Sequence, residues 1–481
     1  MRGRGRWKIV NGVMAVAGVL AVGLAGYAAP AGAAPATGAT QTSPDQVSAE
    51  AALGTPQLNK TGKVQEVIRQ LVQCGGTMYA VGSFTSINQG SHNYRRENIF
   101  SFSATAPYTI TSWAPKVNGR INTIAFSGSH CSDAYVGGDF TRVNGTRVMD
   151  IAEISTTTGD VVPAFGTNAN LEVFTVLAVK GHLLVGGDFT YINGSHDPFM
   201  ASVSPVTGQD DGFLHLNISG TYKFCAKGGH PCTNSHHSQV YNQELSHSGT
   251  LDLVEGRFTS VGGKHRQQIF MLNLAGAKGT VTGWTSPEWD GSDPSAYPYF
   301  ECWPPVAFYI RTAAWSASDS TVYVATTGFH PAQNLSLTLR TGLCDSVSAF
   351  PAGHISVTHK WIEYSGCDSY YSVSADTGAV YAAGDPRWAE NSGTCNKQGP
   401  GAVPDMGLQG FHRANGTVEL NSSGTALYTM TRANADDMLI TRAGLWIAST
   451  NRYTVNKCGD LKGPSGHNAA DHAGICFLPY P

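Results

Sequence analysis

The chain alternates short apolar runs with glycine-containing turns along most of its length after residue 50. Four runs resemble one another closely: an apolar strand leads to glycine and Phe-Thr, and the residues that follow alternate apolar and polar before Asn-Gly or a similar pair. Period-two alternation that ends in such a pair is typical of a strand followed by a tight hairpin. The four copies are YAVGSFTSIN from Tyr79, YVGGDFTRVNG from Tyr135, LVGGDFTYING from Leu184 and LVEGRFTSVGG from Leu253.

Each copy belongs to a larger unit of four predicted strands. One strand-like segment precedes the copy, as in INTIAFSGS, and a further hairpin follows it, as in DIAEISTTTGDVVPAF. The same strand recurs in weaker form at Tyr323, Tyr381 and Trp446, which makes seven copies at an average spacing of about 61 residues. Seven such units predict an all-β fold, a seven-bladed β-propeller of four-stranded blades. A solenoid or tandem β-sandwiches stay open as alternatives.

The two ends of the predicted repeat region are expected to meet. The chain finishes with GICFLPYP, a single strand after the seventh copy, so the last blade has only three strands of its own. We expect residues near Thr55–Thr61 to supply its outer strand and close the ring, which removes an open sheet edge. Residues 51–481 then form one propeller domain, and the polar residues 34–50 form a disordered tether outside the core.

The first 33 residues have the pattern of a secretory signal peptide. Basic residues between Arg2 and Lys8 precede an apolar stretch from about Val13 to Tyr27, and small residues follow at 31–33. We therefore expect a secreted, extracellular protein without membrane insertion after cleavage. A retained anchor stays open, because the apolar segment is nearly long enough to span a bilayer.

Composition narrows the class of partner. Only 14% of the residues are charged, 41% are hydrophobic, and the formal net charge is −3. Loss of residues 1–33 removes four basic residues and no acidic ones, so the formal charge becomes −7. This balance disfavours a polyanionic partner, nucleic acid included. We expect a monomer that binds no nucleic acid.

All ten cysteines follow the predicted signal peptide, and an even number in an exported chain predicts disulfides. A zinc site at Cys225 and Cys232 with nearby histidines is the alternative, but no paired Cys-x-x-Cys motif supports it, and we predict no metal site there. The pairings that we expect are Cys74–Cys131, Cys225–Cys232, Cys302–Cys344, Cys367–Cys395 and Cys458–Cys476.

The YVGGDFTRVNG unit with the hairpin after it resembles the delta-sixty repeat of exported bacterial β-propeller proteins of uncharacterised function. The resemblance is specific over about residues 64–284 and only topological over 310–481. It implies a fold and carries no catalytic residues, because the repeated residues are structural. The repeated rings are expected to pack between blades: Phe84, Phe140, Phe189 and Phe258.

Polar residues stand about 9–13 positions before each repeated strand, where the innermost strands of a propeller begin. Two carboxylates from Glu172, Asp368, Asp436 and Asp437 would suit glycoside cleavage, with Arg311 fixing the substrate. Several carboxylates would instead suit calcium, the one candidate cofactor. The same residues also fit a solvated rim without a chemical role. The remaining rim residues, which we assign to ligand binding, are Glu66, Asn122 and Tyr241.

Two long insertions accompany this predicted rim, at residues 212–240 and 284–308. The second is rich in aromatic residues, which include Trp284, Trp289 and Trp303. Aromatic side chains of this kind stack on sugar rings, so we assign the three tryptophans to ligand binding. An equal alternative is that the loop covers the seam between the fourth and fifth blades.

These features favour a secreted binding or scaffold propeller that presents an acidic rim and aromatic loops to an extracellular polysaccharide or a cell-surface glycan. The alternative function is a polysaccharide-cleaving hydrolase or lyase with a carboxylate pair at the propeller axis. The sequence contains no G-x-S-x-G, P-loop, HExxH or dinucleotide-binding motif.

Overall fold

The computed structural model shows a chain that is almost entirely β, as predicted. Within the described part the only helix is the short α1 (Pro287–Asp290), and no helix there is long and apolar enough to cross a membrane. The residues described are 46–59, 65–128, 131–166, 168–224, 234–290, 308–328, 342–392, 394–428, 430, 435–451, 458 and 472–481.

Seven main antiparallel sheets follow one another along the chain, and we number them first to seventh. The first three consist of β2 (Val67–Cys74), β3 (Thr77–Ser83) and β6 (Ile99–Ser103); β7 (Arg120–Ala125), β8 (Asp133–Asp139) and β11 (Ile151–Ser155); and β12 (Val173–Val179), β13 (His182–Gly187) and β14 (Met200–Val203). The fourth and fifth consist of β17 (Gln239–Leu245), β18 (Leu251–Arg257), β21 (Ile269–Asn273) and β22 (Thr280–Val281); and β23 (Tyr309–Trp315), β24 (Thr321–Thr327), β25 (Ser346–Pro351) and β26 (Trp361–Tyr364). The sixth and seventh consist of β27 (Tyr370–Ala375), β28 (Ala379–Gly384) and β31 (Leu408–His412); and β32 (Ala435–Thr441), β33 (Gly444–Ser449) and β34 (Ile475–Pro479).

Smaller sheets form mainly in the segments that connect the second and third strands of a main sheet. β1 (Gln57–Leu58) pairs with the hairpin of β4 (Ser86–Gln89) and β5 (His92–Arg95). The two-stranded sheets are β9 (Arg142–Val143) with β10 (Thr146–Arg147), β15 (Tyr222–Phe224) with β16 (Asn234–His236), β19 (Ser260–Val261) with β20 (Lys264–His265), and β29 (Trp388–Ala389) with β30 (Val403–Pro404).

The seven repeated strands of the sequence are the second strands of the seven sheets, from β3 to β33. The prediction of four strands is right for the fourth and fifth sheets, and the seventh has three strands of its own, as predicted. In the first, second, third and sixth sheets the fourth position is reduced to one isolated β-bridge: Phe102–Ile110, Ile154–Val161, Val203–Asp210 and Phe411–Val418.

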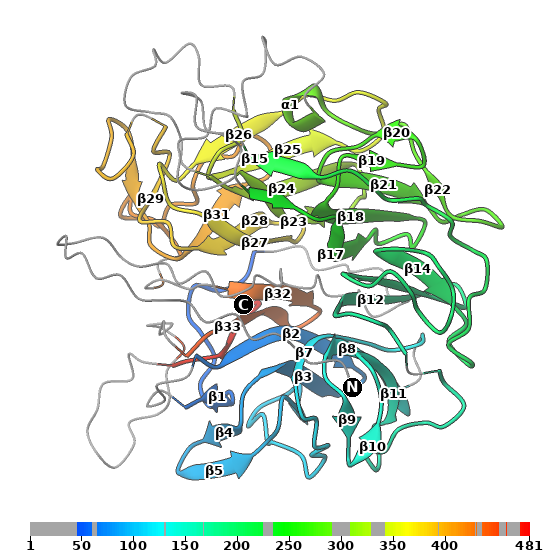
Figure 1. The fold of residues 1–481 in the computed structure, drawn as a ribbon. Helices are drawn as coiled ribbons and strands as arrows, with labels where there is room; N and C mark the ends of the chain where they lie inside the picture. Colours follow the sequence, from blue (N-terminus) through cyan, green and yellow to red (C-terminus); the bar gives the residue numbers. More distant parts are fainter. Residues whose placement is uncertain are drawn as a thin grey trace, which may run out of the picture.

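The first strands of the sheets contact one another in sequence, β2 with β7, then β12, β17, β23, β27 and β32, and β32 contacts β2 again. Figure 1 shows these strands toward the middle of the molecule and hairpins such as β4 and β5 at its outside. The core lies between successive sheets; Phe102 of the first sheet, for example, packs against Trp446 of the seventh. The four repeated phenylalanines are at most 3% exposed, as their predicted packing role requires: Phe84, Phe140, Phe189 and Phe258.

The glycine near the end of each repeated second strand has a steric cause. An added Cβ at Gly82, Gly138, Gly187 or Gly256 would lie only 2.0–2.4 Å from the carbonyl oxygen at the start of the paired first strand. Any larger residue would therefore push the two strands apart. This close approach explains why the glycine recurs in the four copies of the sequence repeat that resemble one another most closely.

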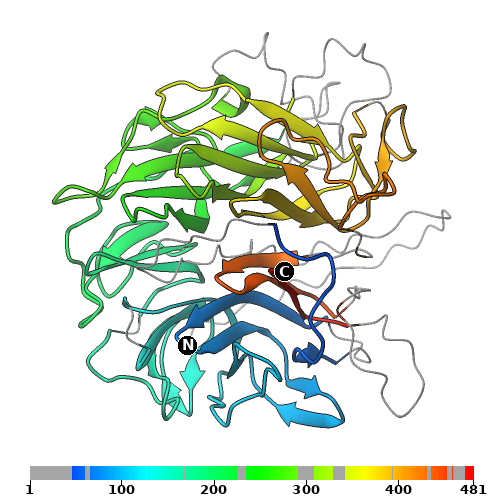
Figure 2. The ribbon, with the colours of Figure 1, turned by 180° about the vertical axis from the view of Figure 1, so that it is seen from behind.

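The N-terminal segment lies along the last strand of the chain (Figure 2). Backbone bonds join Ser48 N to Pro479 O at 2.8 Å, Ala52 N to Phe477 O at 2.8 Å and Leu58 N to Ala473 O at 2.9 Å. The segment is irregular: β1 itself pairs with β4 and shares only one bridge, Gln57–Gly474, with the C-terminal strand region. The contact thus begins earlier than the predicted outer strand at 55–61.

The prediction of a disordered tether over 34–50 is wrong for residues 46–50. Val47 is 2% exposed, its backbone N–H donates to the Tyr381 hydroxyl at 2.9 Å, and its carbonyl accepts from the Tyr428 hydroxyl at 2.6 Å. An apolar side chain at position 47 binds this part of the segment to the core. The predicted signal peptide at 1–33 and residues 34–45 and 60–64 lie outside the described residues.

Three disulfides join cysteines that were expected to pair. Cys74–Cys131 connects the first and second sheets, Cys367–Cys395 lies at the start of the sixth, and Cys458–Cys476 lies in the seventh. Cys344 is also disulfide-bonded. Disulfides indicate an oxidising compartment. Cys225, Cys232 and Cys302 lie outside the described residues.

Candidate functional site

The first strand of each of the seven sheets carries a β-bulge at the same place, close to its start. A bulge leaves one residue outside the ladder and re-aims its side chain. Because the first strands contact one another around the middle of the molecule, the bulges bring one side chain from every sheet to that region. We call this set the central bulge cluster: Arg69, Asn122, Phe174, Tyr241, Arg311, Tyr371 and Asp436.

Contacts and charges connect the members of this cluster. Arg69 and Arg311 both interact electrostatically with Asp436. The Arg311 guanidinium lies 5.3 Å from the centroid of the Tyr371 ring and also interacts electrostatically with Tyr241. Tyr241 packs on Phe174. These interactions link six residues from six sheets. The seventh, Asn122, donates a hydrogen bond to Glu172, which also interacts electrostatically with Arg69.

The cluster has a buried half and an accessible half. Asn122, Phe174 and Tyr241, from the second to fourth sheets, are at most 4% exposed. The other four residues are partly exposed and come from the fifth, sixth, seventh and first sheets, which are neighbours in space: Arg311, Tyr371, Asp436 and Arg69. These four side chains are the members of the cluster that keep exposed surface.

The residues of the accessible half lie in an enclosed environment, which shifts their pKa values. Burial raises the pKa of Asp436 to about 6, although the charges of Arg69 and Arg311 lower it. Burial also lowers the pKa of Arg69. Asp436 keeps some exposed surface but lies deep among the inner strands, so a polar ligand there would interact in a medium of reduced dielectric.

Asp437 has a structural position rather than the predicted catalytic one. Its Oδ2 accepts a hydrogen bond from the Leu71 backbone N–H at 2.9 Å, which joins the seventh sheet to the first. The residue after the bulge makes the same bond in two other sheets: Gln70 accepts from Ile124 N at 2.6 Å, and Thr123 accepts from Val176 N at 3.1 Å. A bond that recurs with three residue types stabilises the contact between neighbouring sheets.

Glu172, a second predicted catalytic residue, is held in an ion pair. Its oxygens accept from Arg120 Nε at 2.7 Å and Arg120 Nη2 at 2.5 Å, and from Asn122 Nδ2 at 2.8 Å. A carboxylate with a bidentate arginine and an amide has most of its acceptor capacity occupied. Glu172 also interacts electrostatically with Arg69, so it borders the central bulge cluster without belonging to it.

Glu66, predicted to bind ligand, caps a turn. Its Oε1 accepts from the backbone N–H of Thr85 at 3.0 Å and from the Thr85 hydroxyl at 2.9 Å. Asn118 in the second sheet and Asn170 in the third likewise accept the backbone N–H of the threonine, here Thr141 and Thr190. The two asparagines also donate to the threonine hydroxyls, where Glu66 accepts. The repeated Phe-Thr pair therefore needs a polar side chain at this place for structural reasons.

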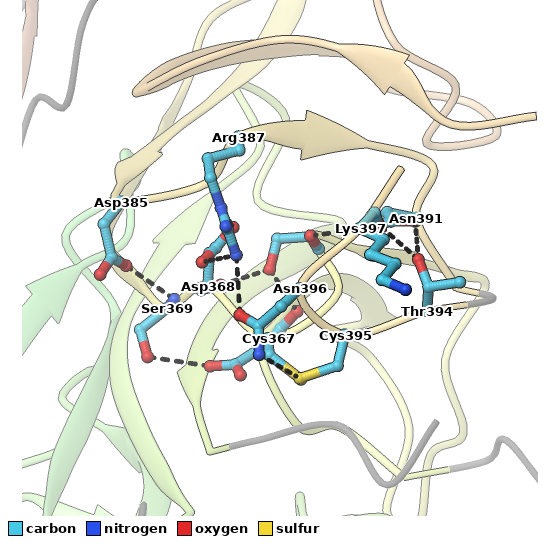
Figure 3. A network of polar contacts seen from close by, with 12 residues as sticks. Cys367, Asp368, Ser369, Asp385, Arg387, Asn391, Thr394, Cys395, Asn396 and Lys397 are labelled. Carbon is cyan, nitrogen blue, oxygen red and sulfur yellow. Dashed lines mark hydrogen bonds and ion pairs between the residues drawn. A yellow bond between two sulfur atoms is a disulfide. The ribbon is translucent and has the colours of Figure 1, made fainter. Parts of the chain in front are cut away.

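Asp368 is the centre of a separate polar network beside the Cys367–Cys395 disulfide (Figure 3). Arg387 donates to both of its oxygens, from Nε at 2.8 Å and from Nη2 at 2.9 Å. The neighbouring Ser369 donates its backbone N–H to Asp385 and its hydroxyl to Asp345. Burial raises the pKa of Asp385 to about 7. Both carboxylate oxygens of Asp368, a predicted catalytic residue, are thus engaged by Arg387.

The predicted stacking role is wrong for Trp284 and Trp289, which are 2% and 0% exposed. The ring centroids of Trp289 and Phe350 lie 4.6 Å apart, and the Trp284 indole N–H donates to the Pro351 carbonyl at 3.0 Å. Both rings belong to a core cluster between the fourth and fifth sheets, as in the alternative of a covered seam. Trp303 lies outside the described residues.

Reasoning from the sequence missed Arg69, Phe174 and Tyr371. The search counted back by a loose distance from the repeated strands, and a bulge adds a residue that such counting cannot place. A usable signal exists in the first five sheets, because an isoleucine or valine directly precedes each bulged residue: Ile68, Ile121, Val173, Val240 and Ile310. Among the described residues, no group of three or more His, Cys, Asp or Glu is arranged to hold a metal ion.

No known family model matches the chain, and no curated protein matches its sequence. The solved structure of U3-55K is similar at 7% identity and a TM-score of 0.45, over 91% of this chain and 100% of that one. The crystal structure of the computationally designed Ika8 protein is similar at 8% identity and a TM-score of 0.42, over 89% of this chain and 99% of that one.

Proposed function

We propose that the protein is a secreted seven-bladed β-propeller of the delta-sixty type, in which each main sheet is one blade. The cyclic order of contacts from β2 to β32 and back supports this architecture. So do the Asp437–Leu71 bond and the N-terminal segment along β34, which both join the two ends of the chain. The disulfides fit export to an oxidising compartment.

The function that the geometry supports best is binding of an extracellular saccharide, on a polysaccharide or a cell-surface glycan. The observation that carries this proposal is the accessible half of the central bulge cluster. Asp436 can accept hydrogen bonds from neighbouring sugar hydroxyls, and the two arginines can donate to sugar oxygens. Tyr371, whose ring has the Arg311 guanidinium 5.3 Å from its centroid, adds a partly exposed aromatic ring beside these polar groups, which suits contact with a pyranose. Contributions from four successive sheets favour a ligand at the middle of the molecule.

Binding is better supported than polysaccharide cleavage. A glycosidase needs two carboxylates placed on either side of one bond. Of the four proposed, Glu172 and Asp368 are paired with arginines and Asp437 accepts a backbone N–H, which leaves Asp436. A single carboxylate between two arginines suits recognition.

Affinity electrophoresis in native gels that contain single soluble polysaccharides tests this function. We expect at least one polysaccharide to retard the protein, without release of reducing ends or unsaturated products. Tyr371→Ala should weaken the retardation about 10-fold, since it removes the aromatic ring. Tyr191→Ala is the matched control, because Tyr191 is 48% exposed in a turn between β13 and β14. Release of reducing ends, or equal retardation of the two variants, would overturn the proposal.

A further inference from the structure

A buried carboxyl group that makes no hydrogen bond within the described part of the chain lies in the sixth sheet. Asp405 follows β30, whose Val403 packs on the core between the fifth and sixth sheets. The residue is 1% exposed, and neither oxygen of its carboxyl has a hydrogen-bond partner among the described residues. A buried carboxyl of this kind is costly when neutral and costlier when ionised. Bound water or a bound ion is a usual reason for such a group.

A second buried carboxyl comes from the outermost strand of the fifth sheet. Glu363 lies in β26, is 7% exposed and interacts electrostatically with Asp405. Its Oε1 accepts the backbone N–H of Glu390. Burial and the nearby carboxyls of Glu390 and Asp405 raise the pKa of Glu363 well above its usual range. Glu363 and Asp405 therefore repel each other when both are ionised, in a medium of reduced dielectric.

Neutral oxygen atoms lie beside this pair of acids. Tyr370 is 0% exposed and interacts electrostatically with both Glu363 and Asp405. Its hydroxyl donates to Oε1 of Gln409, and Gln409 Nε2 donates to the backbone carbonyl of Asp405 at 2.7 Å. The two carboxyls thus share their surroundings with a phenol, a side-chain amide and backbone carbonyl groups.

The arginine next to Asp405 is directed to another acid. The Arg387 backbone carbonyl accepts the Asp405 N–H at 3.1 Å. Its guanidinium instead donates to both oxygens of Asp368, at 2.8 and 2.9 Å, and to Asn396 at 3.0 Å. Arg387 therefore balances the charge of Asp368, and burial remains the cause of the raised pKa of Asp405.

We propose that Glu363 and Asp405 together bind one calcium ion at the seam between the fifth and sixth sheets. A divalent cation balances two carboxylates, and calcium accepts carboxylate, amide, carbonyl and water oxygens in a flexible geometry. Magnesium gives up its water molecules reluctantly, so a buried seam favours calcium. The site needs only two acids, in keeping with the lack of a group of three His, Cys, Asp or Glu ligands among the described residues.

The ion would act on the structure of the molecule and not on the saccharide. Because Glu363 belongs to the fifth sheet and Asp405 to the sixth, calcium would join the two sheets at their outer part. The site contains none of the rim residues that the sequence suggested for calcium. The inference is independent of the proposed function, and its failure would leave saccharide binding unaffected.

Calcium content and thermal unfolding of the full chain test this site. The protein is stripped with EGTA, equilibrated with calcium at pH 7.5 and gel-filtered, and bound calcium is measured by atomic emission. We expect the wild type to hold about one calcium ion more than Asp405→Asn or Glu363→Gln. Calcium should raise the melting temperature of the wild type by several degrees, because it binds the folded chain alone, and magnesium should raise it less.

The variants are chosen to fold. Asn and Gln match the shape of the neutral acids that they replace, so both variants should keep the packing of the seam. Glu255→Gln is the matched control, because it removes a carboxyl that is 0% exposed in β18 of the fourth sheet. This control should keep both the bound calcium and the rise in melting temperature.

Loss of both responses in Asp405→Asn, with their retention in Glu255→Gln, supports the site. A wild type that holds no calcium and melts at the same temperature in calcium and in EGTA overturns it. Retention of both responses in Asp405→Asn also overturns it, because calcium then binds elsewhere. If Asp405→Asn does not fold, Glu363→Gln decides by the same criteria, since it removes the other carboxylate.

Discussion

Asp436 and Asp437 are neighbours in the sequence, but the bulge at Asp436 directs them to different surroundings. Asp436 is the extra residue and joins the two arginines of the central bulge cluster. Asp437 returns to the ladder and accepts the Leu71 N–H of the first sheet. The sequence signals that both residues are polar at the start of an inner strand. It does not signal which one is bulged, because that depends on the register with β33.

Substitution of Asp437 distinguishes its structural role from a catalytic one. Asp437→Asn keeps an oxygen that can accept the Leu71 N–H, so unfolding free energy at pH 7 should change little. Asp437→Leu leaves that buried N–H without a partner and should lower the unfolding free energy by about 1–3 kcal/mol. Urea denaturation measures both. Equal loss in the two variants would contradict the hydrogen-bonding role.

At the scale of strands, the local pattern of apolar and polar residues predicts most of the main elements. Period-two alternation and turn pairs located all seven second strands, because strand formation and hairpin turns depend on nearby residues. The fourth strands were overestimated, since a strand at a sheet edge survives only where pairing and packing both favour it. Site roles could not be predicted in the same way: Glu172 is bound by Arg120 from the preceding sheet, and Asp437 bonds to a residue 366 positions away.

The close approach at the repeated glycines can be tested with one methyl group. Gly138→Ala places a Cβ 2.2 Å from the Arg120 carbonyl oxygen, so the first and second strands must separate. We expect a loss of about 1–3 kcal/mol in unfolding free energy, as for other overpacked sites. Gly353→Ala is the control, because its Cβ would meet no atom within 4 Å. Similar stability of the two variants would refute the steric explanation.

The N-terminal segment should stabilise the chain through its contacts with the seventh sheet. A protein that begins at residue 46 keeps the bonds of Ser48 and Ala52 to β34 and the burial of Val47. A protein that begins at residue 60 loses them and leaves the edge of β34 open. The shorter chain should melt several degrees lower. Identical melting temperatures would show that closure does not depend on residues 46–58.

Across the whole molecule, many carboxyl groups are buried and hold their protons unusually well. Burial raises the pKa of Glu255 and Asp437 to about 8, and of Asp150, Glu153 and Asp385 to about 7. Glu255 is 0% exposed and stands where the second and third sheets have Gly137 and Gly186. The interior thus favours the neutral form of its acids, and the protein takes up protons when it folds.

Stability should therefore be greatest in mild acid. An acid whose pKa is raised by folding stabilises the protein fully below its unfolded value of about 4, and this stabilisation is lost as the pH rises through the folded value. We expect the melting temperature to fall between pH 5 and pH 8. Glu255→Gln, which cannot ionise, should make the fall shallower. A melting temperature that rises over this range would contradict the raised pKa values.

The contacts between the two ends of the chain have a consequence for how the protein is made. Residues 46–58 and the first sheet emerge during synthesis or export well before β34 and Asp437, the segments that they contact. Pairing at such sequence separation is slow, because the intervening chain must first be ordered. The first sheet therefore keeps an uncovered face, and residues 46–58 keep unused backbone bonds, until β32 and β34 have emerged. The yield of folded protein should then depend on what protects the first sheet during this interval, for example a chaperone or early formation of the Cys74–Cys131 bond between the first two sheets.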